Sequence, residues 1–464
     1  MLFNTTRFFV FLTVVLALFY ALPQRFRKYL LLAASYFFYA SWNPKFVALL
    51  LALTAIDYTA GLWLERSTES VRRRTILIAS LTANLGFLGF FKYYNFAASN
   101  IALALGKPAH SFWLDIVLPL GISFHTFQSI SYVVDVYRGQ QRAVRSPVDY
   151  ALFICFFPQL VAGPIVRARD FFRDLYHWRA PAAEEVSRGL FLIALGLTKK
   201  MAFADQFAAV ANAYFGDLAA NPGRLTAWCG VFAFGMQIYF DFSGYTDMAI
   251  GMAKLLGFHF PVNFRRPYLA RSITDFWHRW HISLSTWLRD YLYIPLGGNR
   301  HGRWMTYRNL MLTMLLGGMW HGASWNFLIW GGYHGALLSV ERAIRGGREQ
   351  RQEWTLLYPL QAIFTFTLVL VGWVFFRAAD LRQSLQVIGQ MLAGGPGRML
   401  LQPWHMGLVL VALVVAIAEE RWEAVERLMT APAWAYAAGL AVMLFCLEVF
   451  GVIDASIPFI YFQF

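Results

Sequence analysis

Long apolar runs recur from one end of the chain to the other, and this pattern limits the folds that the chain can adopt. The runs lie at 8–22, 29–41, 46–64, 75–91, 112–137, 189–212, 226–256, 309–320, 324–341, 355–376, 406–418 and 435–450. Only 14% of the residues are charged, whereas a soluble domain has about 25%. Because a spanning helix needs about 20 apolar residues, we predict an all-α polytopic membrane protein with about eleven transmembrane helices. Residues 1–464 are expected to form a single integral-membrane domain, in which the shorter runs are re-entrant or broken helices.

Basic residues gather between the apolar runs, and their positions predict the topology. Lys and Arg cluster at 25–28, 72–74, 138–145, 167–188, 265–271 and 342–351, and the positive-inside rule places such loops in the cytoplasm. The first run lacks a small-residue cleavage site, so we expect a membrane helix there instead of a removable signal peptide. Both termini, including the aromatic tail 451–464, then lie on the outer side. The formal charge of +14 is therefore explained by cytoplasmic loops, which could also attract a polyanionic donor. We expect the protein to contact membrane lipid and not nucleic acid.

The stretch 149–163 has basic loops on both sides, which predicts a re-entrant segment. Pro158, Gly163 and Pro164 are expected to break its helix. Irregular backbone at membrane depth needs cover from protein or from a water-filled cavity. The sequence therefore predicts a cavity near this segment.

A second break is predicted at Gly317-Gly318-Met319-Trp320-His321-Gly322. Because both flanks are basic, we expect two half-helices, 309–320 and 324–341, that meet near His321 inside the membrane. An ionisable side chain at that depth is costly and marks a functional site. Gly331 and Gly335 fit close helix packing, and His334 suits packing and a supporting role equally. Residues 272–335 form the expected catalytic core.

The stretch 273–293 predicts one long amphipathic helix. Ser272 and Asp275 resemble a capping box at its start. Its apolar arc is expected at the inner membrane interface, with Arg279 towards water. His281 lies at the edge of that arc, where a hydrogen-bonded packing histidine is the simpler interpretation. No acid or cysteine accompanies His281 and His278 at a ligand spacing, so we expect no metal.

Two carboxylates interrupt the apolar run 226–256. If Asp241 and Asp247 lie at membrane depth, they should face the protein interior and be paired or hydrated. A structural polar network is favoured over a direct catalytic role. The three cysteines, Cys155, Cys229 and Cys446, lie in or beside apolar runs without a pairing spacing, so packing is their expected role.

Several long motifs resemble the membrane-bound O-acyltransferase family. They are Phe276-Trp-His-Arg-Trp-His-Ile-Ser-Leu-Ser-Thr-Trp-Leu-Arg-Asp-Tyr-Leu-Tyr-Ile-Pro-Leu-Gly-Gly-Asn-Arg300, Leu315-Leu-Gly-Gly-Met-Trp-His-Gly-Ala-Ser-Trp325, Phe240-Asp-Phe-Ser-Gly-Tyr-Thr-Asp-Met-Ala-Ile-Gly251, Ile122-Ser-Phe124 and Ala162-Gly-Pro164. Within the family, the chain is similar to the bacterial alginate O-acetyltransferase branch. The resemblance implies a helical bundle around a central tunnel, in the bacterial inner membrane. It matches the invariant family histidine to His321 and a second functional histidine to His281.

The resemblance also implies a transmembrane relay of acetyl groups. Acetyl-coenzyme A from the cytoplasm is the implied donor substrate, with no permanently bound cofactor. The acceptor is a hydroxyl on the outer side, from which a periplasmic acetyltransferase partner modifies an exopolysaccharide such as alginate or cellulose. The tail Phe459-Ile-Tyr-Phe-Gln-Phe464 resembles a C-terminal motif whose tyrosine accepts an acyl group, which makes Tyr461 an acceptor or an interfacial anchor.

The expected chemistry agrees with these residues. A hydroxyl nucleophile needs a base, and histidine ionises near neutral pH. Negative charge develops on the thioester oxygen, and the indole of Trp320 or Trp325, or N–H groups freed at the break, are candidate donors; one such donor is typically worth about 3–4 kcal/mol. Arg279 and other basic residues of the inner face are candidates to bind coenzyme A phosphates.

Alternatives from other classes remain at this stage. A transporter of the acyl donor or polysaccharide would also have many apolar helices, but it should show paired broken helices in corresponding halves. A scaffold for a polymer synthase would leave the His321 motif unexplained. A donor that carries an aminoacyl group on a carrier protein would share the same motifs.

Overall fold

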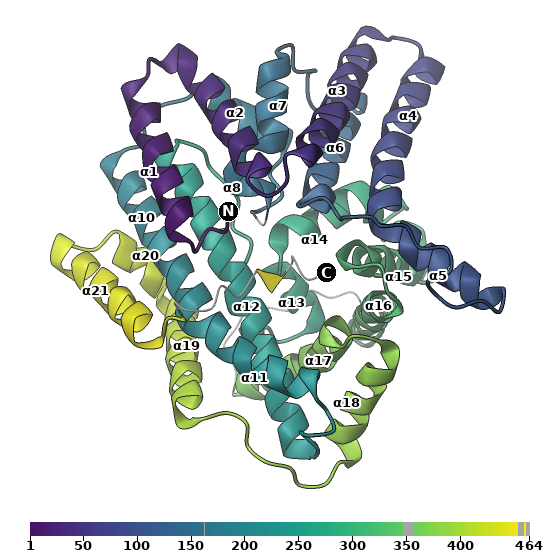
Figure 1. Cartoon of the computed structure of the whole chain (residues 1–464), viewed down its shortest axis with the longest axis vertical. Coiled ribbons are helices and arrows are strands. Elements are labelled where there is room, and N and C mark those ends of the chain that lie inside the picture. The colour runs from purple at the N-terminus through teal and green to yellow at the C-terminus, as the bar shows by residue number, and fades with distance from the viewer. Residues whose placement is uncertain (162, 347–355, 453–458, 461–464) are drawn as a thin grey trace. The chain divides into compact units, whose positions relative to one another are not determined.

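The computed structural model describes residues 1–161, 163–346, 356–452 and 459–460, and these residues form helices and loops without a β-strand (Figure 1). The chain divides into two compact units. Unit 1 contains residues 1–190 and 248–261, and unit 2 contains residues 191–247 and 262–464. The predicted class, an all-α polytopic membrane protein, is confirmed.

Unit 1 is built mostly from the first third of the chain. Its helices are α1 (Thr6–Ala21), α2 (Gln24–Ala40), α3 (Lys45–Arg66), α4 (Ser70–Leu88), α5 (Tyr94–Ala104), α6 (Ile122–Tyr137), α7 (Pro147–Cys155), α8 (Phe157–Leu160), α9 (Ala168–Tyr176) and the start of α10 (Ala183–Leu197). A π-helical turn at Gly89–Tyr93 joins α4 to α5.

The predicted break in 149–163 is present, although its position differs from the expectation. All of 149–161 is buried. The helix is interrupted at Phe156, whose ψ of 112° ends α7, and not at Pro158, which lies in the first turn of α8. Proline is tolerated there because the first N–H groups of a helix have no partner within the helix.

Unit 2 contains most of the remaining helices. They are α11 (Asp205–Gly216), α12 (Arg224–Leu255, whose last residues belong to unit 1), α13 (Ile273–Arg279), α14 (Ile282–Leu288), α15 (Gly302–His321), α16 (Trp325–Arg345), α17 (Tyr358–Arg377), α18 (Leu381–Ala393), α19 (Pro403–Trp422), α20 (Ala424–Met429) and α21 (Ala433–Phe450). Thr198–Ala204 and Arg289–Tyr293 are π-helical, and Pro267–Leu269 forms a 3₁₀ turn.

Five helical segments of the described chain are long and apolar enough to cross a membrane. They are Lys45–Arg66, Ser70–Ala104, Tyr358–Arg377, Pro403–Trp422 and Ala433–Phe450. In α19 and α21 most of the apolar side chains are exposed. Exposed apolar helix faces of this length are stable in lipid and not in water, so the protein is a multi-pass membrane protein.

Helices α15 and α16 form a close helical hairpin, and they correct the prediction of two half-helices. They contain 20 and 21 residues, which at 1.5 Å per residue is about 30 Å, the thickness of the hydrocarbon core. The chain leaves the helix only at Gly322. Gly317 and Gly318 remain helical, because a glycine costs a helix only about 1 kcal/mol and packing outweighs that cost.

The hairpin instead uses its glycines for close contact. A Cβ atom on Gly318 would overlap the carbonyl oxygen of Phe327, and one on Gly331 would overlap that of Met314. On Gly335 it would lie 3.0 Å from Met311 Sδ. The predicted packing role of Gly331 and Gly335 is confirmed.

We expect Gly318→Ala to destabilise the protein, because the new methyl group forces two backbones apart; overpacking of this kind costs about 1–3 kcal/mol. The measurement is the thermal unfolding midpoint in detergent. Gly86→Ala is the matched control, since a Cβ atom on this helical glycine of α4 meets nothing within 4 Å. Equal midpoints for the two variants would contradict the close approach of α15 and α16.

Candidate active site

His321 is the last residue of α15, and its side chain is 5% exposed. Gly322 follows in an extended conformation, with φ −166° and ψ 157°, and a Cβ atom there would overlap the ring of Phe327. The imidazole centroid lies 5.1 Å from that of Trp330 and 5.0 Å from that of Phe376. His321 is thus an ionisable side chain at a helix end, held within an aromatic wall.

His281 lies between two short helices, which corrects the prediction of one continuous helix over 273–293. The predicted N-cap is present, since Ser272 Oγ accepts the N–H of Asp275 at 3.1 Å, but the capping box is not closed at Ser272, because Asp275 Oδ2 accepts the N–H of Arg271 at 3.0 Å. However, α13 ends at Arg279 and α14 begins at Ile282, and His281 between them has φ 43° and ψ 55°. This left-handed conformation costs a residue with a side chain about 1–3 kcal/mol and tends to occur at functional sites.

The hydrogen bonds around Asn263 assign the proton on the His281 ring. Asn263 Oδ1 accepts the backbone N–H of Ser283 at 3.1 Å, and this donor identifies the amide atom as oxygen. The same oxygen lies 3.1 Å from His281 Nδ1. Nδ1 must therefore carry a proton, and in the neutral imidazole the acceptor lone pair is on Nε2. Sequence reasoning missed Asn263, because no local pattern marks it.

The two predicted histidines both contact one indole. The Trp320 ring centroid is 4.9 Å from that of His321 and 6.1 Å from that of His281, and Trp320 is 5% exposed. Trp325, the other predicted indole donor, is 52% exposed at the start of α16. Trp320 is thus the indole that the structure places with both histidines.

His334 is fully buried behind this group. Its ring centroid lies 4.9 Å from that of Trp330, which also contacts His321, and 5.3 Å from that of Trp277. These contacts place His334 one ring away from His321. His278, by contrast, is exposed.

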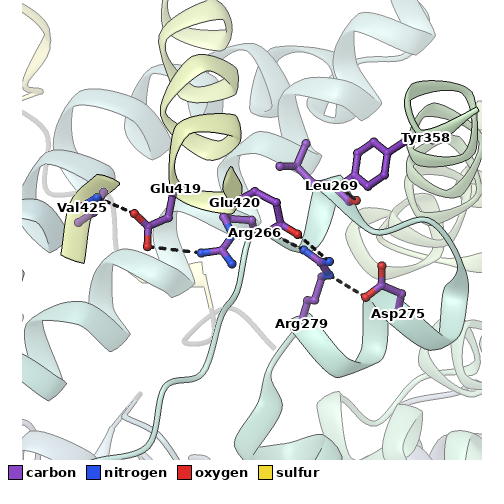
Figure 2. Close-up of polar contacts among 8 residues, drawn as sticks. All are labelled: Arg266, Leu269, Asp275, Arg279, Tyr358, Glu419, Glu420 and Val425. Carbon is purple, nitrogen blue, oxygen red and sulfur yellow. Dashed lines mark hydrogen bonds and ion pairs between the residues drawn. The ribbon is translucent and has the colours of Figure 1, made fainter. Parts of the chain in front are cut away.

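Arg279 is buried and paired, so the prediction that it points towards water is wrong. Figure 2 shows its guanidinium between two carboxylates: Nε donates to Asp275 at 2.7 Å, and Glu420 accepts at 2.9 Å. Glu420 also accepts from Arg266 at 2.6 Å, which ties the loop before α13 to the end of α19. Asp275 and Glu420 therefore neutralise the charge of Arg279, which lies two residues before His281. A positioning role therefore suits Arg279 better than binding of donor phosphates.

The expectation that Asp241 and Asp247 face the interior in pairs is confirmed. Lys199 Nζ lies 2.6 Å from Asp247, and Lys200 Nζ lies 2.8 Å from Asp241 and 2.7 Å from Asp205. The two lysines were not predicted as partners, although their position inside the apolar run 189–212 was an available signal. Tyr461, the predicted acyl acceptor, lies outside the described residues, but Phe459 and Ile460 before it are described.

Buried ionisable side chains in a helical membrane protein are typical of a membrane-embedded functional site. Residues 68–377 of this chain match the membrane-bound O-acyltransferase family, and the chain belongs to this family. It is therefore an O-acyltransferase, which sets aside the transporter and scaffold alternatives.

Relatives named for O-acetylation align with most of the chain. It is 45% identical to the probable alginate O-acetylase AlgI of Azotobacter vinelandii, over 85% of this chain and 79% of the relative. It is 40% identical to the peptidoglycan O-acetyltransferase of Helicobacter pylori, over 84% and 80%. A more distant relative is the teichoic acid D-alanyltransferase of Bacillus subtilis, with 30% identity over 55% and 68%.

Proposed function

We propose that this chain is an O-acetyltransferase of the bacterial inner membrane that transfers acetyl groups from cytoplasmic acetyl-coenzyme A to a hydroxyl on the periplasmic side. The acetyl group then serves the O-acetylation of an exopolysaccharide, with alginate and cellulose as candidates. Relatives named for alginate and peptidoglycan O-acetylation support the acetyl donor and the polysaccharide acceptor. The observation that carries the proposal is the placement of His281 and His321 against the same indole.

His321 is the proposed general base. It removes the proton of the attacking hydroxyl as that oxygen forms a bond to the thioester carbonyl carbon. The carbonyl oxygen becomes an oxyanion, for which the Trp320 indole N–H is the proposed donor. When the intermediate collapses, the carbon–sulfur bond breaks, and the imidazolium returns its proton to the leaving thiolate of coenzyme A.

His281 is proposed to assist with Nε2. Its hydrogen bond to Asn263 holds the ring in one tautomer, which leaves the electron pair of the neutral ring on Nε2 to accept a proton or to orient the donor. The left-handed backbone at His281 fixes the direction of the side chain. The surrounding aromatic rings exclude water, which limits hydrolysis of the thioester.

A second donor class is an aminoacyl group, because D-alanyltransferases are among the relatives. They match 55% of this chain, whereas the O-acetyltransferase relatives match 84% or more. The larger match favours acetyl. Parallel assays with acetyl-coenzyme A and with a D-alanyl carrier protein separate the two donors.

Tyr461 is proposed to receive the acetyl group before a periplasmic acetyltransferase partner takes it, with both termini of the chain on the periplasmic side. Incubation with labelled acetyl-coenzyme A should then label the C-terminal peptide, as detected by mass spectrometry. Tyr461→Phe should remove this label and slow transfer to the partner, because it lacks the phenolic oxygen. Tyr29→Phe, at a half-exposed tyrosine far away in sequence, is the control. Transfer at the wild-type rate in Tyr461→Phe would mean that the tyrosine is an anchor and that the partner's hydroxyl is attacked directly.

A further inference from the structure

A buried cluster of three charged side chains lies in unit 2, outside the proposed reacting groups. Lys200 Nζ is 2.7 Å from Asp205 Oδ1 and 2.8 Å from Asp241 Oδ1. The three side chains are 1–2% exposed. Two carboxylates thus share one ammonium group, and Asp241 has a second oxygen directed elsewhere. A buried carboxylate oxygen requires a donor.

That donor comes from the C-terminal tail. The backbone N–H of Ile460 donates to Asp241 Oδ2 at 2.6 Å, across 219 residues of sequence. Backbone N–H bonds to a carboxylate are short and strong. The side chains at this point are also buried, since Phe459 and Ile460 are 0% and 1% exposed. The tail is therefore bound at this point both by its backbone and by its side chains.

The aromatic contacts of Phe459 lead towards the active site. Its ring centroid lies 4.3 Å from that of Tyr245 and 5.8 Å from that of Phe242. Phe242 in turn contacts His281, with centroids 4.7 Å apart and planes at 89°. One ring thus separates the bound tail from His281. All of these residues belong to unit 2.

The end of α21 is held to the same region. Gln206 Nε2 donates to the carbonyl oxygen of Phe450 at 2.7 Å, and the N–H of Val452 lies 3.4 Å from the carbonyl oxygen of Met201. Met201 and Lys200 belong to the π-helical turn 198–204, and π-helical turns are frequent at functional sites. This turn therefore contacts Val452 at the start of the tail, and its Lys200 supplies the charge that holds Asp241.

We propose that Asp241, held by Lys200, is a positioning residue that binds the C-terminal tail at Phe459 and Ile460, one aromatic ring away from His281, and so aligns the tail for acyl transfer. The inference rests on the proposed function for its catalytic consequence, but the binding of the tail is measurable without substrate. Asp241→Ala leaves Lys200 paired with Asp205 alone, so no buried charge of the cluster loses its partner. Ile460→Pro removes the N–H donor and leaves the charged side chains in place, although it also replaces the buried side chain and fixes φ.

The first measurement is hydrogen exchange of C-terminal peptides of the full-length protein in detergent. Ile460 should exchange at least about tenfold faster in Asp241→Ala than in wild type, as expected for loss of a hydrogen bond to a charged group. Exchange at the wild-type rate would overturn the proposed binding of the tail. This result does not depend on acyl chemistry, so it is separate from a failure of the proposed function.

The second measurement compares the two halves of the reaction. In Ile460→Pro, transfer to the acceptor should fall about tenfold or more, whereas hydrolysis of acetyl-coenzyme A and its KM should stay within about twofold of wild type. The control variant Ile460→Val keeps the N–H and should transfer acetyl groups at a rate close to that of wild type. Asp241→Ala combined with Ile460→Pro should be no slower than either alone, because both remove the same bond. An equal fall of hydrolysis and transfer, or additive losses, would overturn the positioning role.

Discussion

Replacement of His321 by alanine is expected to slow acetyl transfer by about 10²–10⁴-fold, the usual contribution of a general base. Thioester cleavage should fall with transfer, because the attacking hydroxyl then keeps its proton. The fold should survive, since His321 is the last residue of α15 and the helix ends at Gly322 in any case. The measurement is release of coenzyme A together with acceptor labelling, with the unfolding midpoint recorded on the same sample.

His278→Ala is the matched control for this prediction. His278 lies on α13, three residues before His281, but its side chain is exposed. Loss of this imidazole should leave both rates within about twofold, as expected for a surface substitution. Wild-type acetyl transfer in His321→Ala would end the catalytic assignment of His321, whatever the control shows.

Replacement of Arg279 by methionine is expected to destabilise the protein by about 3–5 kcal/mol, because it removes the buried cation that pairs with Asp275 and that shares Glu420 with Arg266. The side chains of Arg279, Asp275 and Glu420 are 8%, 14% and 13% exposed. Acetyl transfer should fall as well, because this network fixes the chain just before His281. The measurement is the unfolding midpoint in detergent, combined with the transfer rate below that midpoint.

The control is Arg289→Met. The side chain of Arg289 is 59% exposed and pairs with its neighbour Asp290. An exposed ion pair contributes about 0–1 kcal/mol, so this variant should unfold close to wild type. Addition of Asp275→Asn and Glu420→Gln to Arg279→Met should recover part of the stability, since neutral side chains need no cation. If Arg279→Met unfolds like Arg289→Met, the buried network does not stabilise unit 2.

The sequence predicted the elements whose signals are local. Apolar runs predicted a polytopic helical membrane protein, because the transfer of a helix into lipid depends on its own side chains. The N-cap at Ser272 was predicted correctly for the same reason, since Ser272 and Asp275 lie within three residues of each other. His321 was selected by its place at the predicted break and His281 by motif resemblance, and the structure places both against one indole. Their catalytic roles remain predictions.

The tertiary structure decided what depends on contacts between distant residues. Glycines at 317 and 318 suggested a break, yet the helix continues because the packing of Gly318 against α16 and of Gly317 against Leu288 outweighs their small propensity cost. Residues 273–293 have the periodicity of one helix, yet the chain turns at His281, where hydrogen bonds accepted by Asn263 and the ion pairs of Arg279 hold the flanking segments. Glu420 lies 141 residues from Arg279, and Ile460 lies 219 residues from Asp241. Local periodicity carries no information on such partners, because their energy exists only once the chain has folded.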